Sequence, residues 1–515
     1  MQTQSQEITP VAKALMAESQ ITIHPSYRVG TLNRRIFGTF VEHMGRCVYT
    51  GIYEPTHATA DEHGFRQDVA ELVRELAPTI VRYPGGNFVS NYKWEDGVGP
   101  KDQRPRRLDL AWRSIETNQV GTDDFLAWCE RLEIEPMLAV NLGTRGLEDA
   151  VEYLDYVNGT GTTLAAQRAA NGREEPWGVK VWCLGNEMDG PWQIGHMSAA
   201  DYGRAAEEVG SAFRRFDNTL ELVACGSSNR MIPTFGAWEH EVLERSIDVV
   251  DHISAHAYYE PVGGDMTSFL ACAEDMDRFI RSVTATADAV AAARKVDKKV
   301  SVSFDEWNVW FQERFNGEHS IEVQEAPPLI QDVFNVADAV VVGSLLITLM
   351  RHTDRVAMAC QAQLVNIIAP IRTEPDGPAW RQTIFHPFAL TSRYARGEVL
   401  DLRVNCPKID TPYFGEVDQI WSTATLDDST GDLVLFCVNR AETGDLTATV
   451  DLSVFGDVQL VEHILLHEDD PTLTNSAGNE RVAPKQGASS IDESLLTLTL
   501  PAVSWHCIRL SVRSA

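Results

Sequence analysis

Positive charge is scarce in this sequence. The chain has 44 lysines and arginines against 74 aspartates and glutamates, which gives a formal net charge of −30 at pH 7. Nucleic acids and anionic membrane surfaces would repel such a chain, because their phosphates carry the same sign of charge. We therefore expect no nucleic-acid partner and no membrane partner. A neutral substrate such as a sugar is still allowed.

Closely spaced cysteines are missing. The nine cysteines are an odd number, stand far apart and form no Cys-x-x-Cys motif. Several lie inside apolar runs, as small buried hydrophobic residues do. The pattern predicts free thiols in a reducing compartment.

Long hydrophobic segments are absent as well. Residues 1–20 are polar and have no apolar centre beside positive charges, so we expect no secretory signal. The longest uncharged run near a predicted helix, Ala339–Met350, is shorter than the ~20 residues that cross a bilayer. Together with the cysteine pattern, this predicts a cytoplasmic protein.

What the sequence does contain is a repeated alternation of short apolar runs and amphipathic segments. We predict eight strands, each followed by a helix, and apolar residues at helical spacing over 65–76 are one example. Eight parallel units closing into a (β/α)8 TIM barrel are the simplest architecture for this order. An open doubly wound sheet would normally carry a glycine-rich phosphate turn, and Pro84-Gly-Gly-Asn87 lacks its spacing.

The pattern changes after residue 397. Segments such as 446–452 and 496–500 alternate apolar and polar residues with a period of two, which is typical of strands with one buried face. We therefore predict an antiparallel β-sandwich of the jelly-roll type at the C-terminus. The predicted division is residues 1–30, an extension with a strand that completes the sandwich; residues 31–397, the barrel; and residues 398–515, the sandwich.

Two predicted strands end in a glutamate among tryptophans. The first run is Trp182-Cys-Leu-Gly-Asn-Glu187-Met-Asp-Gly-Pro-Trp192, and the second is Val300-Ser-Val-Ser-Phe-Asp-Glu306-Trp-Asn-Val-Trp310. In a TIM barrel, the carboxyl ends of the strands face one pocket. Cleavage of a glycosidic bond needs one acid for the leaving oxygen and a second carboxylate that attacks or activates water. Glu187 and Glu306 are therefore a candidate catalytic pair, and a separation of ~5 Å would predict retention of the anomeric configuration.

The other predicted strand ends carry carboxylates, amides and a phenol. Amides and carboxylates bind hydroxyl groups, and aromatic rings stack on the apolar faces of sugars, so we predict a pocket for a neutral polyhydroxylated molecule. Asn186 could hold a sugar hydroxyl while Glu187 acts on the bridging oxygen, so we assign Glu187 as acid/base and Glu306 as nucleophile. The residues at or just after these strand ends are Glu42, Asn87, Asn141, Asn186, Glu187, Tyr258, Glu306 and Gln363.

Several of these residues also have structural interpretations. Glu42 could be an ion-pair partner of Arg82, because buried carboxylates are usually paired. In a regular strand Asp305 would point to the face opposite Glu306, which favours a packing or ion-pair role. His252 and His256 are four residues apart on a predicted strand without a zinc-type ligand set, so we expect no metal and no cofactor.

The same patterns leave other function classes open. A metal-dependent sugar isomerase would need several carboxylates and histidines at the strand ends. A non-catalytic sugar-binding protein would use the sandwich and would not depend on the two glutamates. Within the hydrolases, an enzyme acting on β-xylosides or β-glucosides is also possible, because a carboxylate pair does not specify the sugar ring.

Five segments resemble a known enzyme family. The runs 40–49, 81–87, 182–192, 305–310 and 363–370 are similar to those of intracellular α-L-arabinofuranosidases of glycoside hydrolase family 51. The resemblance implies a retaining, exo-acting enzyme that removes terminal α-L-arabinofuranosyl residues, with Glu187 as acid/base and Glu306 as nucleophile. Its substrates would be arabinose-containing oligosaccharides of the arabinan or arabinoxylan type.

The resemblance also implies substrate-binding residues and an assembly. The sugar ring would lie among Glu42, Arg82, Asn87, Asn186, His256, Tyr258 and Gln363. Trp112 and Trp310 would face the rest of the substrate. Members of the family are often hexamers, so we expect a homo-oligomer.

Overall fold

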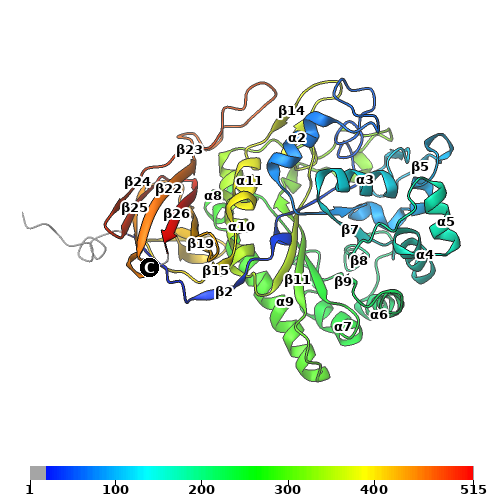
Figure 1. Ribbon diagram of the computed structural model, residues 1–515, viewed down its shortest axis with the longest axis horizontal. Coiled ribbons are helices and arrows are strands. Elements are labelled where there is room, and N and C mark those ends of the chain that lie inside the picture. Colours follow the sequence, from blue (N-terminus) through cyan, green and yellow to red (C-terminus); the bar gives the residue numbers. More distant parts are fainter. Residues whose placement is uncertain (1–18, 514–515) are drawn as a thin grey trace, which may run out of the picture.

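The structure is a computed structural model that describes residues 19–513 (Figure 1). Most of the predicted N-terminal extension therefore lies outside the described residues. Two bodies are visible in Figure 1, a large barrel with its helices and a smaller sandwich beside it. Within residues 19–513, no helix combines the length and the apolar character needed to cross a membrane.

Eight parallel strands close into the barrel in the order of the chain, which confirms the predicted TIM barrel. Each strand delivers its carboxyl end to the same side of the barrel. Their bounds are β3 (Gly38–Phe40), β4 (Ile80–Tyr83), β7 (Glu135–Ala139), β8 (Val181–Leu184), β9 (Glu221–Ala224), β10 (His252–Tyr259), β11 (Ser301–Val309) and β12 (Val356–Gln361).

Helices surround these strands. They are α2 (Gln67–Leu76), α3 (Thr122–Leu132), α4 (Leu147–Asn158), α5 (Thr163–Ala170), α6 (Ala199–Phe216), α7 (Ala237–Ser246), α8 (Met266–Leu270), α9 (Ala273–Arg294), α10 (Val336–Arg351) and α11 (Phe385–Tyr394). Helices α8 and α9 are separate, because the chain turns between Leu270 and Ala273. Helix α5 was not predicted from the sequence.

Two hairpins interrupt the β/α order. Strands β5 (Arg107–Leu108) and β6 (Ile115–Glu116) pair in the segment between β4 and α3. Strands β13 (Ile371–Thr373) and β14 (Ala379–Arg381) pair after β12. Both hairpins are too short to show an alternating pattern in the sequence. The first of them carries Trp112 in its turn.

Two sheets form the sandwich, and their facing sides bury an apolar core that includes Ile21, Leu435 and Leu498. The five-stranded sheet has the order β16 (Arg403–Asn405), β1 (Ser19–Thr22), β21 (Leu446–Asp451), β25 (Leu495–Leu500) and β24 (Ser489–Asp492). The seven-stranded sheet has the order β2 (Arg28–Thr31), β15 (Glu398–Leu400), β19 (Ile420–Asp427), β20 (Asp432–Asn439), β26 (Ser504–Arg513), β22 (Asp457–Leu466) and β23 (Lys485–Gln486).

The N-terminal residues contribute to both sheets of the sandwich. Strand β1 lies between β16 and β21, with antiparallel and parallel pairing respectively. Strand β2 pairs with β15 at the edge of the other sheet. In Figure 1 the blue strand β2 accordingly lies next to β15 at the sandwich. The single N-terminal strand expected to complete the sandwich is thus two strands, and the first of them is internal to its sheet.

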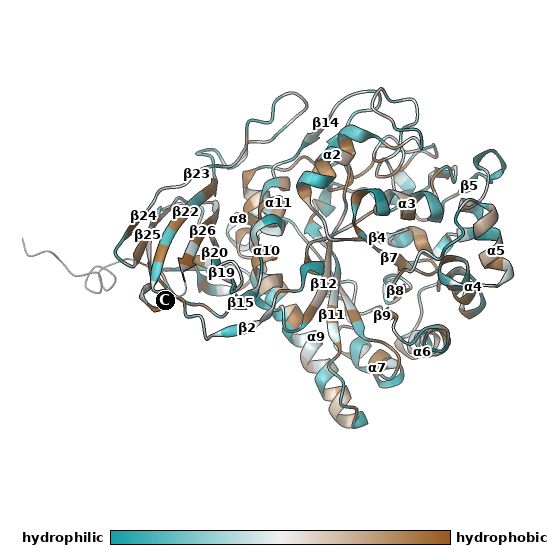
Figure 2. Cartoon of the chain, viewed as in Figure 1, coloured by the Kyte–Doolittle hydropathy of each residue, from teal (hydrophilic) through white to brown (hydrophobic). Residues whose placement is uncertain are grey.

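Helix α10 joins the two bodies. Nearly all of its side chains are buried, as expected for a helix that is apolar on every side. It contacts α9, α11 and β11 of the barrel and β19, β20 and β26 of the sandwich. Figure 2 shows it between the two bodies. The uncharged run around this helix therefore belongs to the protein core.

Candidate active site

The two glutamates of the predicted pair face each other at the carboxyl end of the barrel. Glu187 lies three residues after the end of β8, and its backbone has a φ of 42°, a left-handed value that costs free energy for a non-glycine residue. Glu306 lies within β11. One carboxylate oxygen of each side chain lies within 4.8 Å of the other. Both side chains are at most 10% exposed.

A cavity of ≈ 330 Å³ opens above this pair. The predicted site residues that line it are Glu42, Asn87, Trp112, Glu187, Tyr258, Glu306, Trp310 and Gln363. Arg82 and His256 contact these residues, Asn186 contacts Arg82, and all three are buried. The structure therefore brings eleven of the twelve predicted residues together, although they are spread over most of the barrel. The exception is Asn141, which does not line the cavity and donates to the Tyr92 carbonyl at 2.9 Å.

Two donors hold the carboxylate of Glu306. The Arg82 guanidinium donates to Oε1 at 2.6 Å, and the Tyr258 hydroxyl donates to Oε2 at 2.7 Å. The second terminal nitrogen of Arg82 donates to the Asn186 side-chain oxygen at 2.7 Å. A charge-assisted bond of this kind is short and strong, and it fixes the orientation of the carboxylate. Glu306 is therefore oriented from two sides.

His256 bridges the acidic groups of the site. Its Nδ1 donates to Glu187 at 2.8 Å, and its Nε2 donates to Asp305 at 2.9 Å. Burial lowers the pKa of His256, but Glu306, Asp305 and Glu187 outweigh that effect and raise it to about 10. The imidazole is therefore a cation at neutral pH, which offsets part of the negative charge in the site.

The expectation that Asp305 points away from Glu306 is wrong. Both carboxylates reach Arg82, at 3.7 Å and 2.6 Å, so they lie on the same side of the strand. The reason is a bulge in β11, where three residue steps from Phe304 to Trp307 face two steps in β12. An extra residue in one strand breaks the alternation of side chains. The expected ion-pair role of Asp305 is present, with Arg82 and His256 as its partners.

Glu42 accepts three hydrogen bonds. Its carboxylate accepts from the Phe88 amide at 3.0 Å, the Trp112 indole at 2.9 Å and the Gln363 side chain at 3.0 Å. Burial raises its pKa to about 8, and the charge of Glu306 adds to the shift. Arg82 pairs with Glu306 and Asp305 instead, so Glu42 is not its ion-pair partner in the described part of the chain.

Gly86 allows the backbone to approach these acids closely. A Cβ at this position would lie 3.0 Å from Oε1 of Glu306 and 3.4 Å from Oε2 of Glu42. Any larger residue would push against both carboxylates. The sequence Pro84-Gly-Gly-Asn87 thus allows a close approach of the backbone to the two carboxylates.

Trp192 lines the cavity and contacts Glu187, and the sequence reasoning did not assign it to the site. Its indole nitrogen donates to Oε2 of Glu187 at 2.5 Å, and nearly half of its surface, 47%, is exposed. The sequence marked it only as one of several nearby tryptophans. Its position five residues after Glu187, beyond a Gly-Pro turn, was the available signal.

The remaining tryptophans divide into two groups. Trp310 lines the cavity and lies edge-on to Tyr258, with ring centroids 5.2 Å apart. Trp94 stacks on Tyr153, and Trp307 is fully buried, so both belong to the core. Further lining residues that were not predicted are Met44, Ser228, Asn229, Gln312, Phe315, Glu318, Ile330, Ile367 and Ile368.

One group of side chains in the described residues has the spacing of a metal site. Glu187, His256 and Glu306 each offer an atom, all within 4.8 Å of one another. Both ring nitrogens of His256 already face carboxylates, Glu187 at 2.8 Å and Asp305 at 2.9 Å. The Glu306 carboxylate already accepts hydrogen bonds from Arg82 and Tyr258. These residues therefore fit a hydrogen-bonded acid pair better than a metal ligand set.

A (β/α)8 barrel whose strand ends place two carboxylates this close together has the architecture and the site of a glycoside hydrolase. Comparison with known proteins defines the family. A model of the alpha-L-arabinofuranosidase 1 domain matches residues 72–279, and a model of the alpha-L-arabinofuranosidase C-terminal domain matches residues 305–504. The chain belongs to the α-L-arabinofuranosidases of glycoside hydrolase family 51.

Individual relatives cover nearly the whole chain. An intracellular exo-α-(1→5)-L-arabinofuranosidase of Streptomyces lividans is 53% identical over 96% of this chain and 75% of its own length. An exo-α-(1→6)-L-arabinofuranosidase of Bifidobacterium longum is 49% identical over 96% and 98%. Among solved structures, a family 51 α-L-arabinofuranosidase from Bifidobacterium longum has a TM-score of 0.94 at 47% identity, over 96% of this chain and 100% of its own.

Proposed function

We propose that this protein is a retaining, exo-acting α-L-arabinofuranosidase that releases arabinofuranosyl residues from the non-reducing ends of arabinan or arabinoxylan oligosaccharides. The observation that carries this proposal is the carboxylate pair, whose oxygens lie within 4.8 Å. That spacing suits direct attack by one carboxylate, since inverting enzymes keep the two groups ~6.5–9.5 Å apart to admit a water molecule.

The proposed reaction has two displacements. An oxygen of Glu306 attacks the anomeric carbon, while protonated Glu187 gives its proton to the leaving glycosidic oxygen, so that the C–O bond breaks and a glycosyl ester forms. Glu187 then removes a proton from water, whose oxygen attacks the same carbon and expels the Glu306 carboxylate. The bonds from Arg82 and Tyr258 to Glu306 support its role as nucleophile, because they orient the attacking group.

The sugar ring is proposed to lie against Glu42, Asn87, Asn186 and Gln363. Their carboxylate and amide groups suit the hydroxyls of a furanose ring. Because burial raises the pKa of Glu42 to about 8, this group carries a proton at neutral pH that it can donate to a sugar hydroxyl. Trp112 and Trp310 are assigned to stacking contacts with the substrate beyond the ring.

The proposed linkage is α-(1→5). This is the linkage in the names of several relatives, including a Bacillus subtilis protein that is 46% identical over 97% of this chain. An α-(1→6) linkage is the second candidate, because the Bifidobacterium longum relative bears that name. The cavity does not contain a basic side chain among its lining residues, which fits a neutral sugar.

We further propose that the protein acts inside the cell as a homo-oligomer, with a hexamer as the expected state. The nine cysteines are all free, and several relatives are named intracellular enzymes. The proposed domain division is a barrel over 31–397 and a sandwich over 398–515, completed by the N-terminal strands β1 and β2. Light scattering coupled to size exclusion measures the mass of the assembly directly.

Hydrolysis of chromogenic α-L-arabinofuranoside tests the function. We expect cleavage of this substrate and little or none of the β-xyloside and β-glucoside. Activity confined to the latter two would refute the substrate assignment. The first-formed anomer, followed by NMR, tests the mechanism, and an inverted product would contradict attack by Glu306.

A further inference from the structure

The turn of the β5–β6 hairpin forms one end of the substrate cavity. Trp112 lies in this turn, is 6% exposed and donates from its indole nitrogen to Glu42 at 2.9 Å. The same carboxylate lines the cavity beside Glu306. The position of the turn therefore determines where Trp112 stands and which hydrogen bonds Glu42 receives.

Asp109 holds this turn through two backbone hydrogen bonds. Its carboxylate accepts from the Ala111 amide at 3.1 Å and from the Trp112 amide at 2.8 Å. The Asp109 amide closes the hairpin by donating to the Ser114 carbonyl at 2.9 Å. The residue is 2% exposed, and no cationic side chain between residues 19 and 513 forms an ion pair with it. A buried carboxylate without a cation costs free energy, so its retention needs a specific reason.

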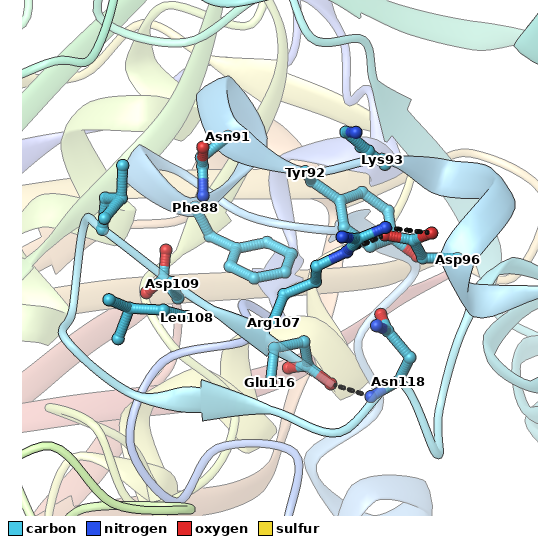
Figure 3. A pocket seen from close by; sticks show the side chains of 11 residues that line it. Phe88, Asn91, Tyr92, Lys93, Asp96, Arg107, Leu108, Asp109, Glu116 and Asn118 are labelled. Carbon is cyan, nitrogen blue, oxygen red and sulfur yellow. Dashed lines mark hydrogen bonds and ion pairs between the residues drawn. The ribbon is translucent and has the colours of Figure 1, made fainter. Parts of the chain in front are cut away.

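A second cavity, of ≈ 210 Å³, lies on the far side of the turn. Figure 3 shows the Phe88 ring in its centre, with Arg107 and Tyr92 to one side and Leu108 and Asp109 to the other. Phe88 and Asp109 line this cavity, whereas their partners Glu42 and Trp112 line the substrate cavity. The turn thus separates the substrate cavity from the second cavity. Leu110, at its tip, is 57% exposed and gives little support by packing.

We propose that Asp109 is a positioning residue that holds Trp112 against Glu42 and so keeps the end of the substrate cavity closed. This inference rests on the proposed function of the same site. Asp109 acts through the turn and through Trp112, because its two hydrogen bonds go to the backbone amides of the turn. Without these two hydrogen bonds the turn is free to move into the second cavity.

The charges around Asp109 agree with this role. Burial raises its pKa to about 7, against the effect of the two amide bonds; Glu116 raises it further and His43 lowers it. Glu42 stands on the other side of the turn. Protonation of Asp109 would turn one of its accepting oxygens into a hydroxyl donor. That hydroxyl would face a backbone N–H, which is also a donor, and the hydrogen bond would be lost. We therefore expect the turn to be held more firmly above pH 7 than below it.

A double-mutant cycle tests the proposal. The variants are Asp109→Ala, Trp112→Ala and the combination, assayed on chromogenic α-L-arabinofuranoside. We expect Asp109→Ala to lower kcat/KM by ~10–100-fold, since small misplacements in a site cost this much. In the Trp112→Ala background the same change is expected to cost less than twofold, because residues that act through one another are not additive. Asp109→Asn, which keeps one acceptor, is expected to recover part of the loss.

Asp61 provides a matched control. Its carboxylate also accepts from two backbone amides, those of His63 and Phe65, but it lies outside the substrate cavity. We expect Asp61→Ala to leave kcat/KM within twofold of the wild type. Equal and additive losses from Asp109→Ala in both backgrounds would overturn the positioning role.

Hydrogen exchange separates this proposal from the proposed function. In a peptide covering residues 107–116, Asp109→Ala is expected to speed exchange by at least tenfold at two amides, whether or not the enzyme cleaves arabinofuranosides. Unchanged exchange in this peptide would refute the positioning role of Asp109. A wild-type protein that leaves every arabinofuranoside intact would refute the proposed function. Faster exchange in the Asp109→Ala variant would still support the positioning role of Asp109.

Discussion

At the scale of single residues, the two glutamates have different surroundings. Glu306 receives hydrogen bonds from a guanidinium and a phenol, which suit a group that attacks as an anion. Glu187 contacts His256 and the half-exposed Trp192, which also lines the cavity. The difference in their partners agrees with a nucleophile and an acid/base.

Substitution of each glutamate is expected to give a distinct kinetic signature. Glu306→Gln removes the nucleophile and lowers kcat/KM at least ~10³-fold on every substrate. Glu187→Ala costs ~10²–10⁴-fold on substrates with poor leaving groups and less on aryl arabinofuranosides, which depart without a proton. Azide is expected to restore turnover of Glu187→Ala alone. Exposed Glu313 is the control, and Glu313→Gln should keep wild-type rates; similar rescue of both site variants would contradict the assigned roles.

The Tyr258 hydroxyl gives a second prediction at this scale. Tyr258→Phe removes one hydrogen bond to Glu306, and bonds to charged groups contribute about 1.5–3 kcal/mol, so kcat/KM is expected to fall by ~10–100-fold. Tyr259→Phe is the neighbouring control, because its hydroxyl donates to Asp275 instead of the site. Steady-state kinetics of both variants decide the matter. Equal effects of the two changes would show that the Glu306 contact is unimportant.

At the scale of elements, the bulge in β11 and the β5–β6 hairpin shape the site. The bulge turns Asp305 to the same side as Glu306, and thereby adds a second partner for Arg82 and His256. The hairpin brings Trp112 to Glu42 from a segment outside the barrel strands. Regular β/α geometry alone would supply neither contact.

Strands β22 and β26 of the sandwich hold a buried histidine pair. His463 Nε2 and His506 Nδ1 are 2.9 Å apart. Burial lowers the pKa of His463 to about 4. Burial also lowers the pKa of His506 well below its usual value, and the neighbouring His463 and His467 lower it further. Both rings therefore bind protons more readily in the unfolded chain, so stability falls as the pH decreases from 6.5 towards 4.

A change of both histidines to leucine is expected to flatten this pH dependence. The shift of His463 alone corresponds to about 3 kcal/mol between pH 6.5 and 4. Ser504, which also contacts His506, keeps a partner in the Pro501 carbonyl. Thermal unfolding midpoints of the wild type and the double variant, measured from pH 4 to 7, provide the test. Parallel curves for the two proteins would contradict the prediction.

At the scale of the whole molecule, the barrel and the sandwich share the surface of α10. Gly343, in the middle of this helix, lies against the Trp505 indole of β26, and a Cβ there would fall 2.1 Å from its Cδ1. The missing side chain lets the helix backbone and the indole touch. This contact fixes how closely the sandwich approaches the barrel.

Gly343→Ala is expected to destabilise the protein. Alanine would favour an isolated helix by ~1 kcal/mol, but the clash with Trp505 costs typically ~1–3 kcal/mol or more. The free energy of unfolding is therefore expected to decrease. Adding Trp505→Leu to Gly343→Ala should remove the clash, and the loss in the pair is expected to be smaller than the sum of the single losses. Calorimetric unfolding of the three variants measures this coupling. Strict additivity would refute the proposed contact.

The sequence by itself determined the barrel, the sandwich and the candidate residues. Apolar runs ending in Glu187 and Glu306 predict strand ends, and parallel strands place their carboxyl ends at one pocket, so the pair follows from local pattern and topology. The resemblance to family 51 supplied the remaining residues, such as Arg82 and His256.

Only the tertiary structure decided the contacts among these residues. The bulge that turns Asp305 inward, the donor role of Trp192 towards Glu187 and the anchoring of Trp112 by Asp109 have no periodic signal in the chain. They depend on register and on approaches between segments far apart in sequence. Hydrogen bonds act over about 3 Å, so their partners are fixed by three-dimensional packing, whereas the strands and helices that carry them follow from local hydrophobic patterns.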